Sequence, residues 1–272
     1  MVLSLLLLGC QDVIDVEVPY AGPRLVVEAS LDWQLGSVGN EQAIRLSELR
    51  PYFDSTDPIG VTGAIVEITN DGNGHIVDFV DRGNGYYTTS DFLPVMNQSY
   101  TLKIVNNGTT YIAKETLMPV VAIDRVDQSK ENGFDPNVIE VNVYFNDPLE
   151  EENFYLMIFQ ERKDLFPTLV DVSDEYTNGN EMRIFFEKFN DEDSGERELQ
   201  PGDIVDIKFY GISKTYYNYI RLLIEQNDTG GDPFATIPAP LKGNCINIDD
   251  PDDPALGYFR LTQVDKRKYT VQ

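Results

Sequence analysis

Apart from its carboxylates, this chain of 272 residues contains few side chains that could act as nucleophile, base or metal ligand. It has two cysteines, Cys10 and Cys245, and one histidine, His75. A lone histidine rules out a multi-histidine metal site within one chain, and any Ser-His-Asp arrangement would have to use it. His75 follows an Asn-Gly pair, so we predict a hairpin-turn residue there. No histidine lies near Cys245 in the sequence, so we predict a small buried residue at that position.

Cys10 is the one residue to which the sequence assigns a chemical role. Val2–Leu8 is aliphatic apart from Ser4 and is far shorter than a bilayer span. Such a run, followed by a small residue, is typical of a secretory signal. Leu7-Leu8-Gly9-Cys10 resembles the bacterial lipobox, in which the cysteine thiol is acylated and the cysteine becomes the mature N-terminus. We therefore expect a lipoprotein signal peptide at 1–9 and lipidation of Cys10, although no Lys or Arg precedes the run.

The acyl chains on Cys10 would attach the protein to a membrane surface. One acyl chain binds a bilayer only marginally, whereas the two or three of a lipoprotein cysteine make release slow. Residues 10–23 then form a lipidated tether, although their alternating Val and Ile could also pair as an edge strand. An acidic export signal of a surface lipoprotein would have its acids adjacent, whereas the acids of this stretch are spaced apart. The sequence therefore leaves both the periplasmic and the extracellular face open.

The acidic balance of the chain excludes one class of partner. Net charge is -25, and a nucleic-acid partner would require a basic face. Oxygen ligands for Ca²⁺ occur in "NDEDSG" at 190–195 and "DDPDDP" at 249–254. In the first run an EF-hand register places Pro201 where a bidentate Glu is required, and prolines interrupt the second. We expect solvated loops at both runs, with a weak cation site as the alternative.

Other chemistry has weaker support in the sequence. No phosphate-binding loop, dinucleotide fingerprint or zinc-ligand spacing occurs, so we expect neither a cofactor nor a resident metal. A glycoside hydrolase uses two paired acids, and any two carboxylates of this chain could meet in the folded protein, so the sequence leaves this activity open. Five tyrosines could form an aromatic platform for a glycan or peptide, although packing in the core or between domains is the preferred interpretation. They are Tyr86, Tyr87, Tyr216, Tyr217 and Tyr219.

The elements that would position these residues are mostly β-strands. Ala64, Val66 and Ile68 share one face of a strand at 60–69, and turn clusters such as "NDGNG" at 70–74 recur every 8 to 12 residues. Further strands are predicted at 25–29, 75–81, 86–89, 100–105, 111–116, 141–145, 154–158, 182–186, 205–209 and 257–263. A helix is predicted near 213–228, with Ser213 as its N-cap and Tyr216, Tyr219, Ile220 and Leu223 on its apolar side.

This pattern predicts a mainly β fold in two parts. Residues 24–120 are expected to form an immunoglobulin-like β-sandwich, because 61–117 resembles the transthyretin-like or carboxypeptidase-regulatory type. Pro119–Asp124 reads as a linker, and 121–272 is expected to be a second β-rich domain that carries the helix. Domains of the first type usually bind or present a partner, so we expect no enzyme activity.

The order of features along the chain resembles a known family, the Bacteroidota lipoproteins of domain-of-unknown-function family 4249. The segments that carry the resemblance are "RLVVEASL", "RLSELRPYFDSTDPIGVTGAIVEI", "GNGYYTTSDFLPVMNQSYTLKI", "FNDPLEEENFYLMIF", "ISKTYYNYIRLLIEQND", "GDPFATIPAPLKGNC" and "ALGYFRLTQVDKR". The resemblance implies an outer-membrane lipoprotein that assists a TonB-dependent transporter in nutrient uptake or barrel assembly. It implies no catalytic residues. The alternative is a cell-surface adhesin or a glycan- or peptide-binding protein.

Overall fold

The computed structural model describes residues 24–50, 58–149, 151–190, 196–228 and 240–272. The predicted signal peptide, Cys10 and the tether at 10–23 therefore lie outside the described residues. In chain order the elements are β1 (Leu25–Gln34), β2 (Gln42–Glu48), β3 (Ile65–Asn70), β4 (Ile76–Asp81), β5 (Tyr86–Thr89), β6 (Ser99–Asn106), β7 (Thr109–Thr116), β8 (Arg125–Ser129), β9 (Glu140–Asn146), β10 (Phe154–Glu161), β11 (Thr168–Ser173), β12 (Glu181–Glu187), β13 (Ile204–Ile212), α1 (Lys214–Asp228), β14 (Ile246–Asn247) and β15 (Leu256–Thr270).

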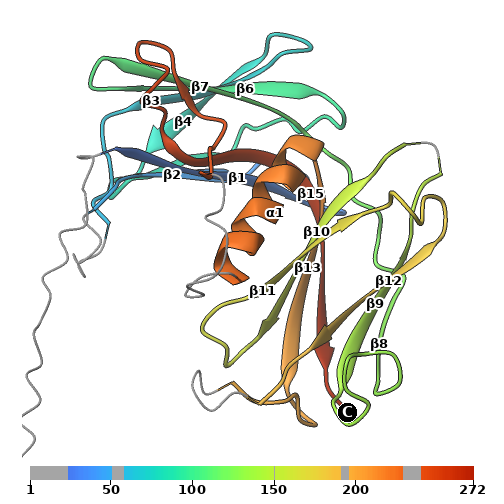
Figure 1. The fold of residues 1–272 in the computed structure, drawn as a ribbon. Helices are drawn as coiled ribbons and strands as arrows, with labels where there is room; N and C mark the ends of the chain where they lie inside the picture. Colours follow the sequence, from blue (N-terminus) through green and yellow to red (C-terminus); the bar gives the residue numbers. More distant parts are fainter. Residues whose placement is uncertain (1–23, 51–57, 150, 191–195, 229–239) are drawn as a thin grey trace, which may run out of the picture.

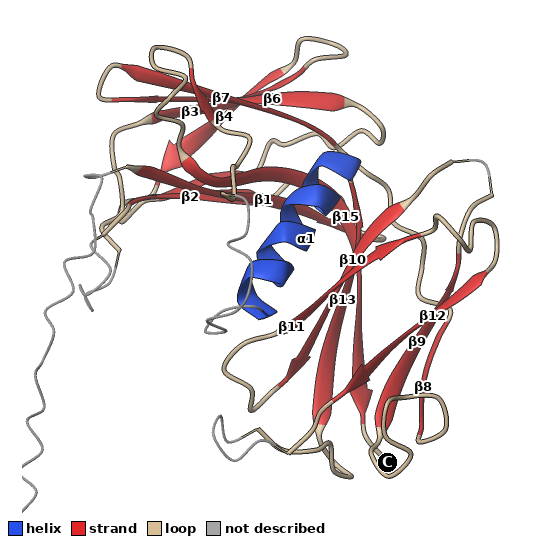
Figure 2. Cartoon of the chain, viewed as in Figure 1, coloured by secondary structure: helices blue, strands red, loops and turns tan. Residues whose placement is uncertain are grey.

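The strands form two sheets, which fold into an N-terminal and a C-terminal sandwich (Figure 2). The larger sheet has 12 strands in the order β11-β10-β13-β15-β1-β2-β5-β4-β3-β6-β7-β14. The smaller sheet has the order β12-β9-β8. The predicted mainly β fold, with sandwich-like sheets and a helix, is confirmed.

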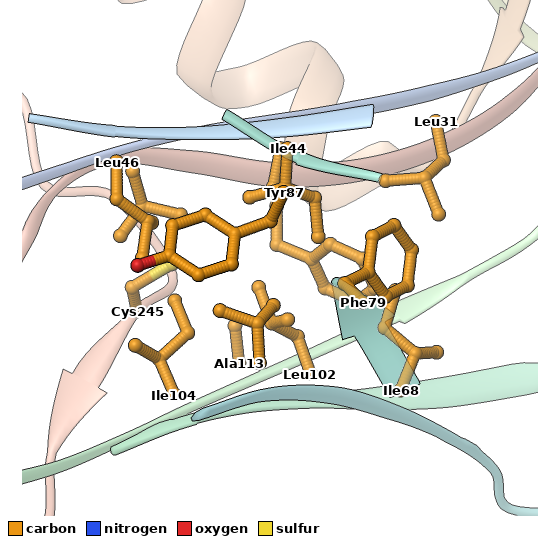
Figure 3. Packing of buried hydrophobic residues seen from close by; sticks show 14 of the residues in the cluster. Leu31, Ile44, Leu46, Ile68, Phe79, Tyr87, Leu102, Ile104, Ala113 and Cys245 are labelled. Carbon is orange, nitrogen blue, oxygen red and sulfur yellow. The ribbon is translucent and has the colours of Figure 1, made fainter. Parts of the chain in front are cut away.

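The core of the N-terminal sandwich follows from period-two alternation along its strands. Leu25, Val27, Ala29 and Leu31 of β1 all point inward, because alternate side chains of a strand face the same side. Figure 3 shows such inward side chains from both layers meeting in one cluster, in which Cys245 lies. Its side chain is buried, as predicted, and burial raises the pKa of the thiol to about 12. Cys245 is thus a packing residue and stays a neutral thiol.

The C-terminal sandwich has a strand that is buried on both faces. Tyr155, Met157 and Phe159 of β10 point into the sandwich core, where they face β9 and β12. Phe154 and Leu156 point to the other side, where α1 covers them. Continuous burial along β10 is therefore the consequence of a helix packed on the outer face of its sheet.

The helix begins and packs as its sequence predicts. The hydroxyl of Ser213 accepts a hydrogen bond from the backbone N–H of Tyr216, at 3.1 Å, which is N-cap geometry. Tyr216 and Ile220 are buried against the sheet, whereas Arg221 and Glu225 form an exposed pair one turn apart. In Figure 1 the helix lies in the corner between the two sandwiches.

One strand, β15, belongs to both sandwiches. Its first part pairs in parallel with β1, from Val26↔Leu256 to Gln34↔Val264. From Val264 onward it pairs antiparallel with β13, and it can be followed in Figure 1 from the upper sandwich to the C-terminus. In addition, β14 pairs with β7 of the N-terminal sandwich. The boundary at 120/121 stays a prediction, but the end of the chain completes the N-terminal sandwich, which the sequence did not predict.

The predicted linker at Pro119–Asp124 runs along this shared strand. The backbone N–H of Val120 donates to the Gln263 side chain at 3.2 Å, and that of Ile123 donates to the Asp265 carboxylate at 2.8 Å. The carbonyl oxygen of Pro119 lies 1.6 Å from where a Cβ on Gly211 would be, so only glycine permits this approach. The connection between the two halves is therefore held at several points.

A buried ion pair joins the two sandwiches to the helix. The Arg260 guanidinium of β15 contacts the Asp32 carboxylate of β1 at 2.6 Å. The same guanidinium lies over the rings of Tyr210 and Tyr216, with centroid distances of 4.5 and 5.4 Å. The hydroxyl of Tyr210 also donates to Asp32, at 3.2 Å. Four elements therefore share one charge network.

We predict that Asp32→Ala destabilises the protein by about 3 kcal/mol, because the Arg260 side chain is only 7% exposed and would lose its counter-charge. Arg260→Met combined with Asp32→Ala should cost clearly less than the sum of the single changes. Urea unfolding of Asp32→Ala, of Arg260→Met and of the double variant measures these costs. Glu28→Ala, which breaks the more exposed pair with Arg45, is the control and should cost less than about 1 kcal/mol. Additive effects of the two changes would contradict the coupling.

A second prediction concerns Glu115 of β7. Burial raises the pKa of its carboxyl above the ordinary 4.5, although hydrogen bonds from Thr116 N–H and Tyr258 hydroxyl oppose the rise. The folded state therefore holds this proton to higher pH than the unfolded state, and stability is lost as pH rises through that interval. Glu115→Gln should melt at a higher temperature than wild type at pH 8 and show no gain at pH 4. An equal gain at both pH values would contradict the prediction.

Candidate binding site at the open edge of the C-terminal sandwich

The structure shows where His75 and the acidic run at 249–254, both selected in the sequence analysis, lie. His75 is an exposed residue that immediately precedes β4, and its backbone N–H donates to the Asn73 side chain at 2.9 Å. The predicted turn role is confirmed. Asp249 and Asp253 of the acidic run at 249–254 hold their loop in place, the first by accepting from Thr110 N–H at 3.0 Å and the second by pairing with Arg24 at 2.9 Å.

Most of the other acidic run, 190–195, lies outside the described residues. Within the part of the chain that the structure describes, no three Asp, Glu, His or Cys side chains gather as a metal site requires.

The five tyrosines do not form one platform. Tyr87 is fully buried in the N-terminal core and donates to the carbonyl of Val61 at 3.0 Å, whereas Tyr86 beside it is partly exposed. Tyr216 and Tyr219 pack against Tyr258 with their rings tilted, and the ring centroids lie 4.9 and 4.7 Å from that of Tyr258. The preferred interpretation, packing, is confirmed for the buried members.

An open apolar surface lies between two edge strands. β11 ends the larger sheet and β12 ends the smaller one, so within the described residues each has one side without a neighbouring strand. An apolar groove of about 350 Å³ runs between them. Its lining comprises Phe134, Thr168, Val170, Arg183, Ile184, Phe185, Phe186, Glu187 and Phe189. Exposed edge strands beside apolar side chains are a template for pairing with another chain.

Two aromatic side chains of this apolar groove, Phe134 and Phe189, are exposed, whereas Phe186 is buried in the core. Phe134 is 80% exposed and Phe189 is 44% exposed. Phe134 comes from the loop between β8 and β9, and its backbone N–H donates to the Glu187 carboxylate at 2.8 Å. Its ring meets the edge of Phe185 with centroids 5.2 Å apart. An exposed aromatic that the backbone holds in place is suited to contact a partner.

A second hollow, the charged pocket, is lined by residues that are close in the sequence to those of the groove. It measures about 420 Å³ and is lined by Glu161, Lys163, Asp164, Leu165, Phe166, Lys188, Glu196 and Arg197. Lys188 stands between two lining residues of the groove, Glu187 and Phe189. Leu165 and Phe166 stand at the rim, 84% and 76% exposed. The groove and the pocket are thus lined by neighbouring segments of the chain, but they share no lining residue.

The floor of the charged pocket is the end of the sandwich core. Phe159 of β10 stacks on Phe186 of β12 with ring centroids 5.0 Å apart, and Glu161 and Lys188 come next on the same faces. Lys188 pairs with Asp164, and its ammonium lies 4.0 Å from Glu161. Two carboxylates thus flank one buried ammonium. A hydrolase with paired acids stays a prediction. Glu161 and Asp164 do not supply a free acid for it, because the Lys188 ammonium lies between them.

Beside the pocket, Asp203 engages the other two cations. Arg197 contacts its carboxylate with two hydrogen bonds of 2.7 Å each, and Lys163 contacts it at 2.9 Å. These contacts, those of Arg197 above all, hold the pKa of Asp203 well below its ordinary value. Arg197 also donates to the backbone carbonyl of Glu198, at 2.8 Å.

Sequence reasoning missed this site. The hairpin "RKDLFPTLV" at 162–170 carries the available signal, since Leu165 and Phe166 are large apolar residues between charges and a proline, where a turn is normally polar. The edge position of β11 and β12 had no comparable signal, because it depends on pairing between distant strands.

Comparison with known proteins places the chain in a family. A family model described as "Domain of unknown function (DUF4249)" matches residues 11–268. The chain belongs to this family. None of the curated proteins compared with this DUF4249 protein matches it.

Solved structures give only weak likenesses to the DUF4249 protein. A cytokine receptor complex has a TM-score of 0.27 at 11% identity, and covers 70% of this chain and 86% of its own. A segment of two fibronectin type III domains from chicken tenascin has a TM-score of 0.22 at 12% identity, covering 70% and 90%. A DUF4785 family protein from Legionella pneumophila has a TM-score of 0.27 at 11% identity, covering 69% and 51%.

The described part of the DUF4249 protein offers no helix with the length and apolar character that a bilayer crossing needs.

We predict that Lys188→Met destabilises the DUF4249 protein by about 3 kcal/mol, because it leaves Glu161 and Asp164 without the cation between them. Lys163→Met is the matched control. Its side chain is 68% exposed and Asp203 keeps Arg197, so it should cost less than about 1 kcal/mol. Urea unfolding distinguishes them. A Lys188→Met variant as stable as wild type would show that the floor of the pocket does not depend on this ion pair.

Proposed function

We propose that this DUF4249 protein is a non-enzymatic, lipid-anchored binding protein of a Bacteroidota outer membrane, where it assists a TonB-dependent transporter. The observation that carries the binding role is the apolar groove between β11 and β12, with its exposed Phe134 and Phe189. The anchoring role rests on the sequence around Cys10.

The groove supports a protein partner for two reasons. Its edge strands leave backbone donors and acceptors that a partner strand could pair with, and its aromatic residues supply apolar area that such a strand would cover. Acyl chains on Cys10 would confine the protein to the plane of the membrane, which raises its effective concentration beside a barrel partner. The glycan-binding alternative finds less support, since its tyrosines are divided between separate clusters.

The binding role predicts co-purification of a TonB-dependent transporter with the tagged protein from native outer membranes. Replacing Phe134 and Phe189 together by Ser should lower the recovered transporter at least about tenfold, because both side chains are exposed hot-spot candidates. Val38→Ser, an equally exposed apolar change in the N-terminal sandwich, is the control and should leave recovery unchanged. Recovery that is insensitive to the Phe134 and Phe189 changes would reject the groove as the docking site, and a pull-down with no barrel would reject the partner.

Anchoring has its own test. Cys10→Ala should move the protein from the outer-membrane fraction to the soluble fraction, because the acylated thiol is lost. A variant retained in the membrane would contradict lipid anchoring without bearing on the groove.

A further inference from the structure

The outer side of one layer of the N-terminal sandwich carries exposed aliphatic side chains. The strands β4, β3, β6, β7 and β14 are neighbours in the larger sheet, and the core takes one side of this layer, as Val66 and Ile68 show. Alternate residues of each strand therefore point outward. Five outward residues on or directly after these strands are large aliphatic side chains that are 52 to 58% exposed. They are Ile65, Ile76, Val80, Ile246 and Ile248.

Strand pairing joins most of these side chains into one surface, which we call the apolar face. Ile65 of β3 is opposite Val105 of β6, and Val105 in turn is opposite a position of β7 that comes two residues before Ile112. Ile112 is opposite Ile246 of β14, and Ile248 follows at the same alternation. These five residues define the apolar face. A contiguous exposed apolar surface on a folded domain is typical of an interaction site.

The side-chain types of the apolar face favour lipid over a protein partner. All five members are Ile or Val, whereas protein interfaces draw most of their binding energy from Trp, Tyr and Arg. Branched aliphatic side chains gain free energy mainly by leaving water for hydrocarbon, which the boundary of a bilayer supplies. The outer side of the other layer lacks this character at β1, where Glu28 and Ser30 are the exposed residues.

The charges beside the apolar face indicate which kind of bilayer it suits. Lys103 pairs with Glu67 at 2.9 Å, and Lys114 pairs with Asp71 at 2.9 Å, so these ion pairs offset each other's charge. The net charge of the whole chain is -25, which disfavours contact with an anionic bilayer. A zwitterionic lipid surface is therefore the better match.

The start of the described chain lies beside the apolar face. Arg24 pairs with Asp253 at 2.9 Å and donates to the carbonyl of Pro254 at 2.6 Å, both in the connection between β14 and β15. Asp249 of the same connection accepts from the backbone of β7 at 3.0 Å. The chain from Cys10 to Arg24 spans at most about 50 Å, so an anchored Cys10 keeps this end of the N-terminal sandwich near the bilayer.

We propose that the apolar face lies on the lipid bilayer that holds the Cys10 anchor, with its aliphatic side chains at the level of the headgroups. The inference rests on the proposed function for the anchor alone. In Figure 1 β3, β6 and β7 lie on the side of the N-terminal sandwich that is turned away from the C-terminal sandwich. Contact of this face with lipid therefore leaves the groove between β11 and β12 uncovered for a partner.

The test attaches the full chain through the Cys10 thiol to a maleimide lipid in a phosphatidylcholine nanodisc. Cys245, the other thiol, is buried and stays unmodified. The isoleucine methyl groups are isotope-labelled, and a lipid with a paramagnetic headgroup enhances the relaxation of those that approach the bilayer.

We expect the strongest relaxation at the isoleucines of the apolar face, because their side chains enter the headgroup region. Two other isoleucines serve as internal controls. Ile59 is 53% exposed but lies outside these strands, and Ile184 lines the groove of the C-terminal sandwich. Relaxation at both should be at least about threefold weaker, since a contact through the apolar face holds them farther from the headgroups.

A double variant decides whether the aliphatic side chains set this orientation. Ile65→Ser combined with Ile248→Ser should lower the relaxation at Ile246 at least about threefold, because much of the exposed hydrocarbon is lost. Ile59→Ser is the matched control and should leave the pattern unchanged. Thermal melting checks that the variants stay folded, as their exposed positions predict.

Equal relaxation at the apolar face, Ile59 and Ile184 would overturn the inference, and so would a pattern that the double variant leaves unchanged. Absence of any preference on the nanodisc, together with transporter recovery that the double variant abolishes, would show a protein contact in place of lipid. Anchoring is tested separately by the Cys10→Ala fractionation, because thiol coupling supplies an anchor whether or not the cell acylates Cys10.

Discussion

The pairing of β15 with two different strands is the constraint on which the rest of the molecule depends. Up to Val264 it lies parallel to β1, and beyond that point it lies antiparallel to β13. Gly257 makes the parallel part possible, because it has a φ of 88° and a Cβ there would lie 2.1 Å from the carbonyl oxygen of Val27. Without this strand the N-terminal sandwich loses a central neighbour of β1 and the C-terminal sandwich loses a neighbour of β13.

The same pairing explains where charge is buried. Arg260 is carried on β15 at the junction, where β1, β13 and α1 meet, so its guanidinium is largely buried and finds its counter-charge in the half-buried Asp32. A buried pair of this kind contributes little net free energy compared with apolar packing, but it strongly penalises arrangements that separate its partners. It therefore favours one placement of the two sandwiches and the helix.

The candidate site is the part of the C-terminal sandwich that this arrangement leaves uncovered. One end of the larger sheet continues into β15 and the N-terminal strands, and α1 covers the outer face of β10. The remaining edge, β11, faces β12 across the groove, and the core between them ends in Glu161 and Lys188 instead of another apolar layer. The open edge of β11 and the charged residues Glu161 and Lys188 thus both lie at the boundary of the C-terminal sandwich.

Sequence by itself determined most of the strands and which of their faces are buried, as in Val66 and Ile68, because these depend on local periodicity. It also located the helix and its Ser213 cap. Acylation of Cys10 and the expectation of no nucleic-acid partner, which follows from the acidity of the chain, stay predictions from the sequence. Sequence reasoning missed β2, β8, β11 and β14, whose short or partly exposed runs carry weak alternation. Only the tertiary structure decided that β15 serves both sandwiches, that β11 and β12 are facing edges, and that Glu161 is buried beside Lys188. Periodicity specifies the face of a strand but not its neighbour, and a pocket consists of neighbours brought from distant parts of the chain.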